Sequence, residues 1–189
     1  MMEEYKIHIK NVVCQRCILS VESILKKLEI AFDEVRLGEA ELKEPLTHEQ
    51  RQLLETEFSK VGFKLLETRE QQMVNHIKSI IIDEVYSNAT SNKKLSEIIS
   101  AQVNYDYSHI THLFSEMEKQ SIQKFHTAVK IERAKELMEY DEYTIAMIAD
   151  LLGYSTPAYL STSFKKATGY SPSAYKKLPK KSRNNLDSV

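Results

Sequence analysis

The sequence predicts two domains of different fold class, an α+β domain over residues 1–68 followed by an all-α domain over residues 71–178. Two observations support this prediction. In the first domain, apolar residues alternate along some stretches and recur at helical spacing along others, whereas the second domain shows helical spacing throughout. The second domain also contains one helix–turn–helix pattern twice, with matching residue types at both turns.

The first domain is expected to contain strands and helices in the order βαββαβ. The strands are expected at residues 5–9, 35–37, 40–42 and 63–66, and the helices at residues 18–28 and 47–61. Thr47 and Gln50 form a capping box at the start of the second helix, and Gly62 supplies a stop after its end. This order of elements predicts a ferredoxin-like sandwich.

The second domain is expected to begin with a helix over residues 74–85, which ends at the polar segment SNATSNKK. Serine, asparagine and threonine in such a run are typical of a loop. A long central helix is expected over residues 121–140. Residues 179–189 form a basic tail that we expect to be flexible.

The central helix is flanked by two copies of one pattern, LSEIISAQVNYDYSHITHLFSE and IAMIADLLGYSTPAYLSTSFKK. Asn104 and Gly153 stand at the turns, and both residue types tolerate a left-handed backbone. Asp106 and Thr156 occupy N-cap positions, and Pro157 opens the last helix. The other matched pairs are Ser100 with Ala149, small residues suited to closely crossing helices, Ile110 with Leu160, and Phe114 with Phe164. This repetition predicts two helix-turn-helix motifs rather than ordinary helical hairpins.

The second copy and its continuation, IADLLGYSTPAYLSTSFKKATGYSPSAYKK, resemble the signature of AraC/XylS-type transcription regulators. The matching residues are Ile148, Ala149, Gly153, Tyr154, Phe164, Lys165, Gly169, Pro172 and Tyr175. The resemblance covers residues 71–178 and implies a seven-helix unit that binds double-stranded DNA. The first copy departs from the family pattern at Ser100, Asn104 and Asp106, where the family has alanine, glycine and serine.

Two motifs on one central helix would fit two successive major grooves, which lie about 34 Å apart. The residues expected to face DNA are Tyr107, Ser108, His109, Thr111 and His112 in the first copy, and Pro157, Ala158, Ser161 and Thr162 in the second. The resemblance implies base contacts from Ser108, Thr111 and His112 in the first copy, and from all four residues in the second. Tyr107 would lie near the DNA backbone. Lys165, Lys166 and Lys176 would attract phosphates. Neither reading face carries arginine, so we expect a monomer to bind modestly and specificity to need a homodimer or DNA shape.

The segment NVVCQRC contains the only cysteines in the chain, Cys14 and Cys17. Residues 4–67 resemble the heavy-metal-associated domain, with the cysteines between the first strand and the first helix, and this resemblance implies binding of Cu(I) or another soft metal. Two thiolates suit linear Cu(I), whereas zinc needs four ligands. Val12 stands where that family has methionine. We expect the helix N-terminus and Arg16 to lower the pKa of Cys17. Metal binding, thiol redox sensing and a purely structural role all stay open.

Charge and composition complete the functional prediction. Residues 1–86 carry a net charge of −4 and residues 87–189 a net charge of +3, so the basic excess lies with the helical domain. The sequence lacks a signal peptide, a membrane span and a catalytic motif, which predicts a cytoplasmic protein that is not an enzyme and requires no cofactor. We expect a sequence-specific transcription regulator that responds to a soft metal or to thiol redox state, with RNA polymerase as a further partner. The alternative is a Cu(I) carrier with a helical protein-interaction module.

Overall fold

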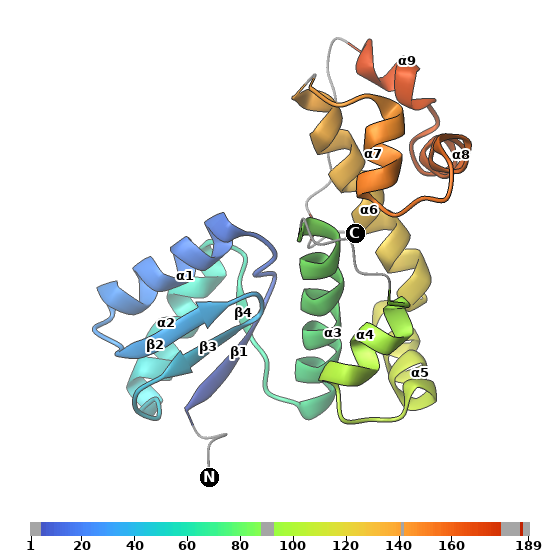
Figure 1. Cartoon of the computed structure of the whole chain (residues 1–189). Helices are drawn as coiled ribbons and strands as arrows, with labels where there is room; N and C mark the ends of the chain where they lie inside the picture. The colour runs from blue at the N-terminus through green and yellow to red at the C-terminus, as the bar shows by residue number, and fades with distance from the viewer. Residues whose placement is uncertain (1–4, 88–92, 141, 179–185, 187–189) are drawn as a thin grey trace. The chain divides into compact units, whose positions relative to one another are not determined.

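The computed structural model describes residues 5–87, 93–140, 142–178 and 186. The chain divides into two compact units, residues 1–79 and residues 80–189, and the boundary lies inside the helix α3 (Arg69–Tyr86) (Figure 1). Most of the polar segment predicted after this helix, and nearly all of the predicted basic tail, lie outside the described residues.

The N-terminal unit has the predicted order of elements. They are β1 (Lys6–Lys10), α1 (Gln15–Lys27), β2 (Phe32–Arg36), β3 (Glu39–Leu42), α2 (His48–Lys60) and β4 (Lys64–Leu65). The strands form a four-stranded antiparallel sheet in the order β2-β3-β1-β4. β4 is one residue shorter at each end than predicted; Phe63, just before it, donates its N–H to Phe58 O at 2.9 Å and packs edge-on against the Phe58 ring, with 5.9 Å between ring centres.

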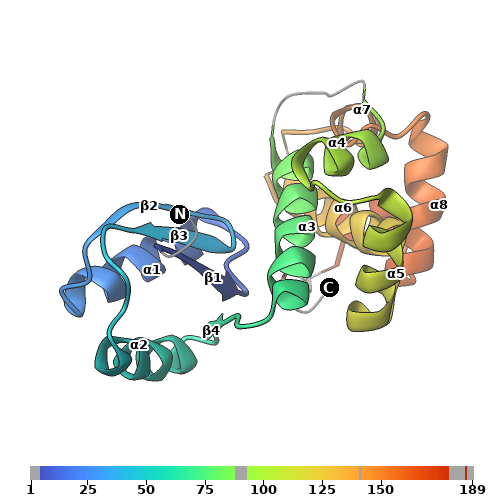
Figure 2. The same cartoon turned by 90° about the horizontal axis from the view of Figure 1, so that it is seen from below.

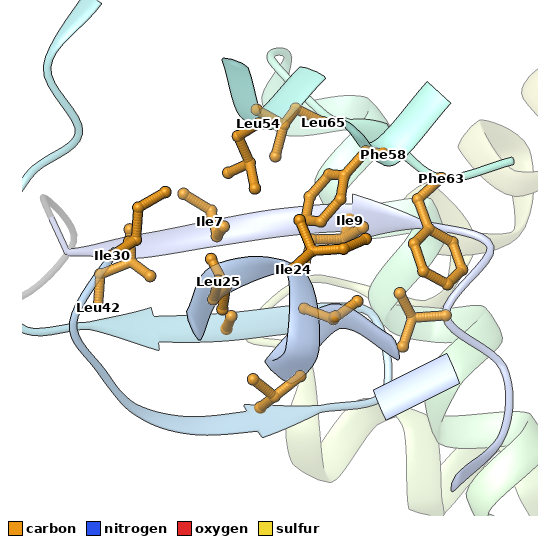
Figure 3. Packing of buried hydrophobic residues seen from close by; sticks show 14 residues of the cluster. Ile7, Ile9, Ile24, Leu25, Ile30, Leu42, Leu54, Phe58, Phe63 and Leu65 are labelled. Atoms are coloured by element: carbon orange, nitrogen blue, oxygen red, sulfur yellow. The ribbon is translucent and has the colours of Figure 1, made fainter. Parts of the chain in front are cut away.

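One apolar core joins both helices of this unit to one face of the sheet. It combines residues of β1 such as Ile9 with Leu25 of α1 and Phe58 of α2, all fully buried (Figure 3). The predicted capping box is present: Gln50 N donates to Thr47 Oγ1 at 3.1 Å, and Thr47 N donates to Gln50 Oε1 at 3.0 Å. Two backbone N–H groups at the start of α2 are therefore satisfied.

The rest of the described chain is helical, as predicted. After α3 come α4 (Leu95–Gln102), α5 (Tyr107–Glu118), α6 (Ile122–Glu139), α7 (Ile145–Leu151), α8 (Pro157–Thr168) and α9 (Pro172–Lys176). With α3 these make seven helices in the described residues from Arg69 onward, the number that the resemblance implies. α6 runs from α4 and α5 at one end to α7 and α8 at the other, and it contacts both α5 and α8 (Figure 1, Figure 2).

The long helix α6 is buried on several sides because it packs against both motifs. Apolar residues such as Phe125, Ile131 and Met138 are almost fully buried. So is an ion pair on the same helix, in which Lys135 Nζ lies 2.6 Å from Glu132 Oε1. The charges are tolerated there because they are paired.

The two helix-turn-helix motifs differ at the turn and at the small residue before it, and each difference corrects one prediction. Gly153 has φ +63° as predicted, but Asn104 does not have positive φ. α4 ends instead at Val103 in an extended conformation (φ −116°), and the chain turns without a left-handed residue. The predicted small-residue crossing holds only for Ala149, which is buried, since Ser100 is exposed.

Substitution of the two turn residues by alanine is expected to have unequal effects. Gly153→Ala should reduce the free energy of unfolding by about 1–2 kcal/mol, the cost of a left-handed backbone for an L-residue. Steric crowding adds little, because the nearest atom to an added Cβ would be Lys130 Nζ at 3.7 Å. Asn104→Ala needs no left-handed conformation and should change stability by less than about 0.5 kcal/mol. Urea denaturation of both variants measures the difference; equal losses would contradict it.

Within the described residues, we find no helix that is both long enough and apolar enough to span a bilayer.

Candidate nucleic-acid interface and cysteine pair

The second helix of each motif, α5 and α8, is anchored by the same features. Side chains cap both helices: Asp106 Oδ1 accepts from Ser108 N at 2.8 Å, and Thr156 Oγ1 accepts from Tyr159 N at 3.1 Å. The inner face of each helix carries fully buried apolar residues, Ile110 and Phe114 on α5 and Leu160 and Phe164 on α8. Each helix therefore has one fixed inner face and leaves the opposite face in solvent.

The residues predicted to face DNA all have solvent access. Exposed are Ser108, His109 and His112 on α5, and Pro157, Ala158, Thr162, Lys165 and Lys166 on α8; partly exposed are Tyr107, Thr111, Ser161 and Lys176. On each helix the reading residues recur at three- and four-residue spacing, which places them on one side. The geometry brings each set together, while the contacts with DNA stay predictions.

A carboxylate lies at the N-terminal end of α5, beside the residues predicted to face DNA. Hydrogen bonds from the Ser108 hydroxyl and then from the Ser108 backbone N–H hold the pKa of Asp106 below its usual range. Asp106 is therefore ionised at neutral pH, which opposes the approach of a phosphate to this helix end. The His109 ring stacks on Tyr105, with 5.7 Å between centres. α5 thus combines a fixed negative charge with imidazole groups.

The repeat is longer than the sequence comparison predicted. α5 ends at Lys119 and α8 at Gly169, both in the left-handed conformation, with φ 55° and 81°. In each copy a serine two residues later, Ser121 or Ser171, caps a third helix by accepting a backbone N–H at 3.2 Å. Each repeat is therefore a three-helix unit.

An aromatic pair closes each three-helix repeat. Phe114 lies 5.8 Å from Phe125 and Phe164 lies 5.3 Å from Tyr175, measured between ring centres. The third helix of each repeat could have been predicted from the sequence by its spacing. Ser121 and Ser171, Phe125 and Tyr175, and Phe114 and Phe164 are each 50 positions apart.

A polar cluster beside the second turn was also missed by sequence reasoning. Lys130 of α6 lies over the ring of Tyr154, with 5.5 Å to the ring centre, and burial lowers its pKa. Burial raises the pKa of Tyr154 to about 12. His126 Nε2 lies 3.0 Å from Glu84 Oε2, and this hydrogen bond lowers the pKa of Glu84. These contacts join residues up to 42 positions apart, which local patterns do not reveal.

The two cysteines lie together at the start of α1. Cys14 is the N-cap residue, Cys17 is the third residue of the helix, and their Sγ atoms are 3.2 Å apart. Partial burial tends to raise the pKa of Cys14, but hydrogen bonds from the Cys17 thiol and from the backbone of Cys17 and Arg16 lower it overall. Burial raises the pKa of Cys17. The prediction that Cys17 carries the lowered pKa is therefore wrong: the hydrogen bond between the two thiols favours the Cys14 thiolate over the Cys17 thiolate.

The loop before the cysteines is held by buried and hydrogen-bonded residues. Val12, at the position where the heavy-metal-associated family has methionine, is 2% exposed and belongs to the apolar core. Asn11 adopts φ 73° and its Nδ2 donates to Gly62 O at 2.9 Å. Among the residues that the structure describes, no third His, Cys, Asp or Glu completes a metal-binding group with the cysteines. One chain thus offers two sulfur ligands.

The two thiols are expected to differ in reactivity. Because the thiolate is the nucleophile, Cys14 should be alkylated by iodoacetamide at neutral pH at least about threefold faster than Cys17. Mass spectrometry of the peptides after short exposure measures both rates. Cys17→Ala removes the thiol hydrogen bond to Cys14 and should slow alkylation of Cys14. Faster labelling of Cys17 in the unmodified protein would refute the assignment.

Comparison with known proteins agrees with this geometry. Residues 99–178 match the family model described as a helix-turn-helix domain. The chain is 29% identical over 104 residues to the Msm operon regulatory protein of Streptococcus mutans, covering 55% of this chain and 36% of that protein. It is 38% identical over 63 residues to the HTH-type transcriptional activator RhaR of Pectobacterium carotovorum, covering 33% of this chain and 22% of that one.

A solved structure gives the same result for the helical unit. The C-terminal domain of AraT, a response regulator from Geobacillus stearothermophilus, is 27% identical and superposes with a TM-score of 0.50, covering 58% of this chain and 88% of that one. The matched family model and this superposition thus identify residues 99–178 as a helix-turn-helix domain. Its helical unit is similar to the matching regions of these transcription regulators. The chain spans only about a third and a fifth of the two curated relatives.

Proposed function

We propose that this protein regulates transcription by sequence-specific binding of double-stranded DNA through α5 and α8, and that its cysteine pair controls that binding. The observation that carries the proposal is the repeated three-helix unit, because both copies present a second helix with an anchored inner face and a solvent-facing outer face. A duplicated motif of this kind suits two successive major grooves.

Charge supports duplex DNA as the partner. Lys165 and Lys166 lie in the last turn of α8 and are exposed, and Lys176 lies in α9. Lysines at these positions would attract phosphates as the early residues of α8 approach the bases. The acidic cap Asp106 weakens the corresponding attraction at α5. We therefore expect one chain to bind DNA with modest affinity and a homodimer to bind more tightly. RNA polymerase is a further proposed partner of the DNA-bound protein.

The N-terminal unit is proposed to act as a ferredoxin-like, heavy-metal-associated-like sensor domain. Its two thiols lie 3.2 Å apart and Cys14 has a lowered pKa, which favours the thiolate that soft metals bind. Two sulfur ligands suit a two-coordinate ion such as Cu(I), whereas a structural zinc site needs four ligands. A bound ion would join the N-cap residue Cys14 to Cys17 in the first turn of α1, and would displace the thiol protons.

Footprinting of the reduced, full-length protein on the DNA upstream of its own gene, with and without Cu(I), tests both parts of the proposal. We expect protection over two adjacent major grooves and a change in protection with Cu(I). The double variant Cys14→Ser, Cys17→Ser should keep the footprint and lose its response to copper. The single variant Ser20→Ala, on the same helix, serves as the matched control and should retain the response.

Each alternative gives a different result in the same experiment. A footprint that ignores copper but changes on oxidation would assign the cysteines to redox sensing. A copper response that survives in the double variant would disprove the role of the cysteines. Tight copper binding without any footprint, and without steep salt dependence of duplex binding, would favour the carrier function instead.

A further inference from the structure

We infer that α8 reads adenine–thymine base pairs in the major groove. The inference rests on the proposed function, since it concerns the helix that enters the groove. It starts from the row of residues Pro157, Ala158, Ser161, Thr162 and Lys165, which recur at three- and four-residue spacing and have solvent access. We call this row the α8 stripe.

Both hydroxyl groups on the α8 stripe donate their only proton to the helix itself. Ser161 Oγ donates to Pro157 O at 2.9 Å, and Thr162 Oγ1 donates to Ala158 O at 3.0 Å. A hydroxyl has one O–H and two acceptor lone pairs, so each oxygen keeps only acceptor capacity for a ligand. Toward DNA, Ser161 and Thr162 therefore act as hydrogen-bond acceptors.

No other side chain in the first two turns of the stripe supplies a donor. Pro157 lacks an N–H and Ala158 ends in a methyl group. Tyr159 lies off the stripe, and its ring packs against Tyr154 with 5.7 Å between centres. Lys165 comes only in the last turn of α8, where it is placed for phosphates. The part of α8 that reaches the bases thus offers acceptors and a methyl group.

This chemistry favours one kind of base pair. Guanine presents two acceptors in the major groove, N7 and O6, which an acceptor face cannot bind. Cytosine and adenine each present an amino donor, and thymine presents a methyl group. Only an adenine–thymine pair combines a donor for Ser161 or Thr162 with a methyl group for Ala158. α5 differs, because His109 and His112 carry ring N–H groups that can donate. The two halves of the DNA site should therefore differ in sequence.

Base analogues in the footprinted duplex test the inference with the full-length protein. 2-Aminopurine in place of adenine moves the amino group out of the major groove while keeping the pair with thymine, and uracil in place of thymine removes the methyl group. Each analogue, placed in one half of the protected segment at a time, should weaken binding about fivefold in the α8 half, the loss of one hydrogen bond or methyl contact.

Two variants assign this effect to α8. Thr162→Val removes the acceptor and keeps the shape, so it should weaken binding to the natural duplex about fivefold and remove sensitivity to 2-aminopurine at one position. Thr127→Val is the matched control: its hydroxyl donates to Gln123 O of α6 at 2.9 Å in the same way, and the residue lies outside the α8 stripe. This variant should keep both the affinity and the sensitivity.

The outcomes separate the inference from the proposed function. A footprint that neither analogue weakens in either half overturns the inference alone. So does a requirement for guanine N7 in both halves, detected with 7-deazaguanine. The absence of any footprint overturns the proposed function and the inference with it.

Discussion

Phe164→Ala is expected to reduce the free energy of unfolding of the helical unit by about 3–5 kcal/mol, the usual cost of truncating a large buried ring. Phe164 is fully buried and packs edge-on against Tyr175. Its loss removes a ring contact between α8 and α9. We therefore expect protection of the groove contacted by α8 to be lost more readily than protection of the groove contacted by α5. Urea denaturation and footprinting of the same variant measure both effects.

Two further variants test whether these effects are specific to the buried ring of Phe164. Tyr159→Ala removes a ring from the same helix, but this ring is 58% exposed, and stability should change by about 1 kcal/mol or less. Phe114→Ala removes the equivalent ring of the first repeat and should affect the other groove. A loss of protection over both grooves in each variant would show that the helical unit unfolds as one cooperative body.

The double variant Lys165→Ala, Lys166→Ala is expected to weaken duplex binding on the order of thirtyfold near 0.15 M salt. Each phosphate contact contributes about 0.9 to the slope of log K against log salt, so the slope should fall by about 1.8. Both lysines are exposed at the end of α8. The measurement is a salt titration of the binding constant on the footprinted duplex.

Charge removal elsewhere gives the matched control for that experiment. Lys26→Ala, Lys60→Ala removes two exposed lysines from the N-terminal unit, so the net charge of the protein changes equally. This variant should keep the salt slope. Replacement of Lys165 and Lys166 by arginine should preserve both affinity and slope. A double alanine variant with an unchanged slope would remove α8 from the DNA interface.

The order of elements could be predicted because local patterns determine it. Alternation around Ile7 and Ile9 indicated β1, and the Thr47–Gln50 pair marked the start of α2. Repetition of caps and apolar residues indicated both helix-turn-helix motifs. Each of these signals lies within a few neighbouring residues, where spacing alone decides which side chains share a face.

Other features depend on backbone geometry or on distant partners and could not be predicted. The turn at Asn104 is extended because Val103 ends α4 in that conformation, although asparagine tolerates the alternative. The order of the two thiol pKa values depends on the hydrogen bond between the thiols, which lowers the pKa of Cys14 and raises that of Cys17. The bonds made by the hydroxyls of Ser161 and Thr162 depend on their side-chain conformations, so the acceptor character of α8 became visible only in three dimensions.

The position of α6 makes the two repeats unequal partners. This helix supplies the third helix of the first repeat, with Ser121 as its cap and Phe125 as its aromatic contact, and it also forms the surface against which α8 packs. The second repeat therefore depends on a helix of the first, while α6 itself is also bonded to α3 through His126 and Glu84. Shortening the chain after α6 would expose the part of α6 that α8 covers, and α7, α8 and α9 alone would expose apolar surface as well. The second of the two exposed helices, α8, thus depends for its packing on a helix that belongs to the first repeat.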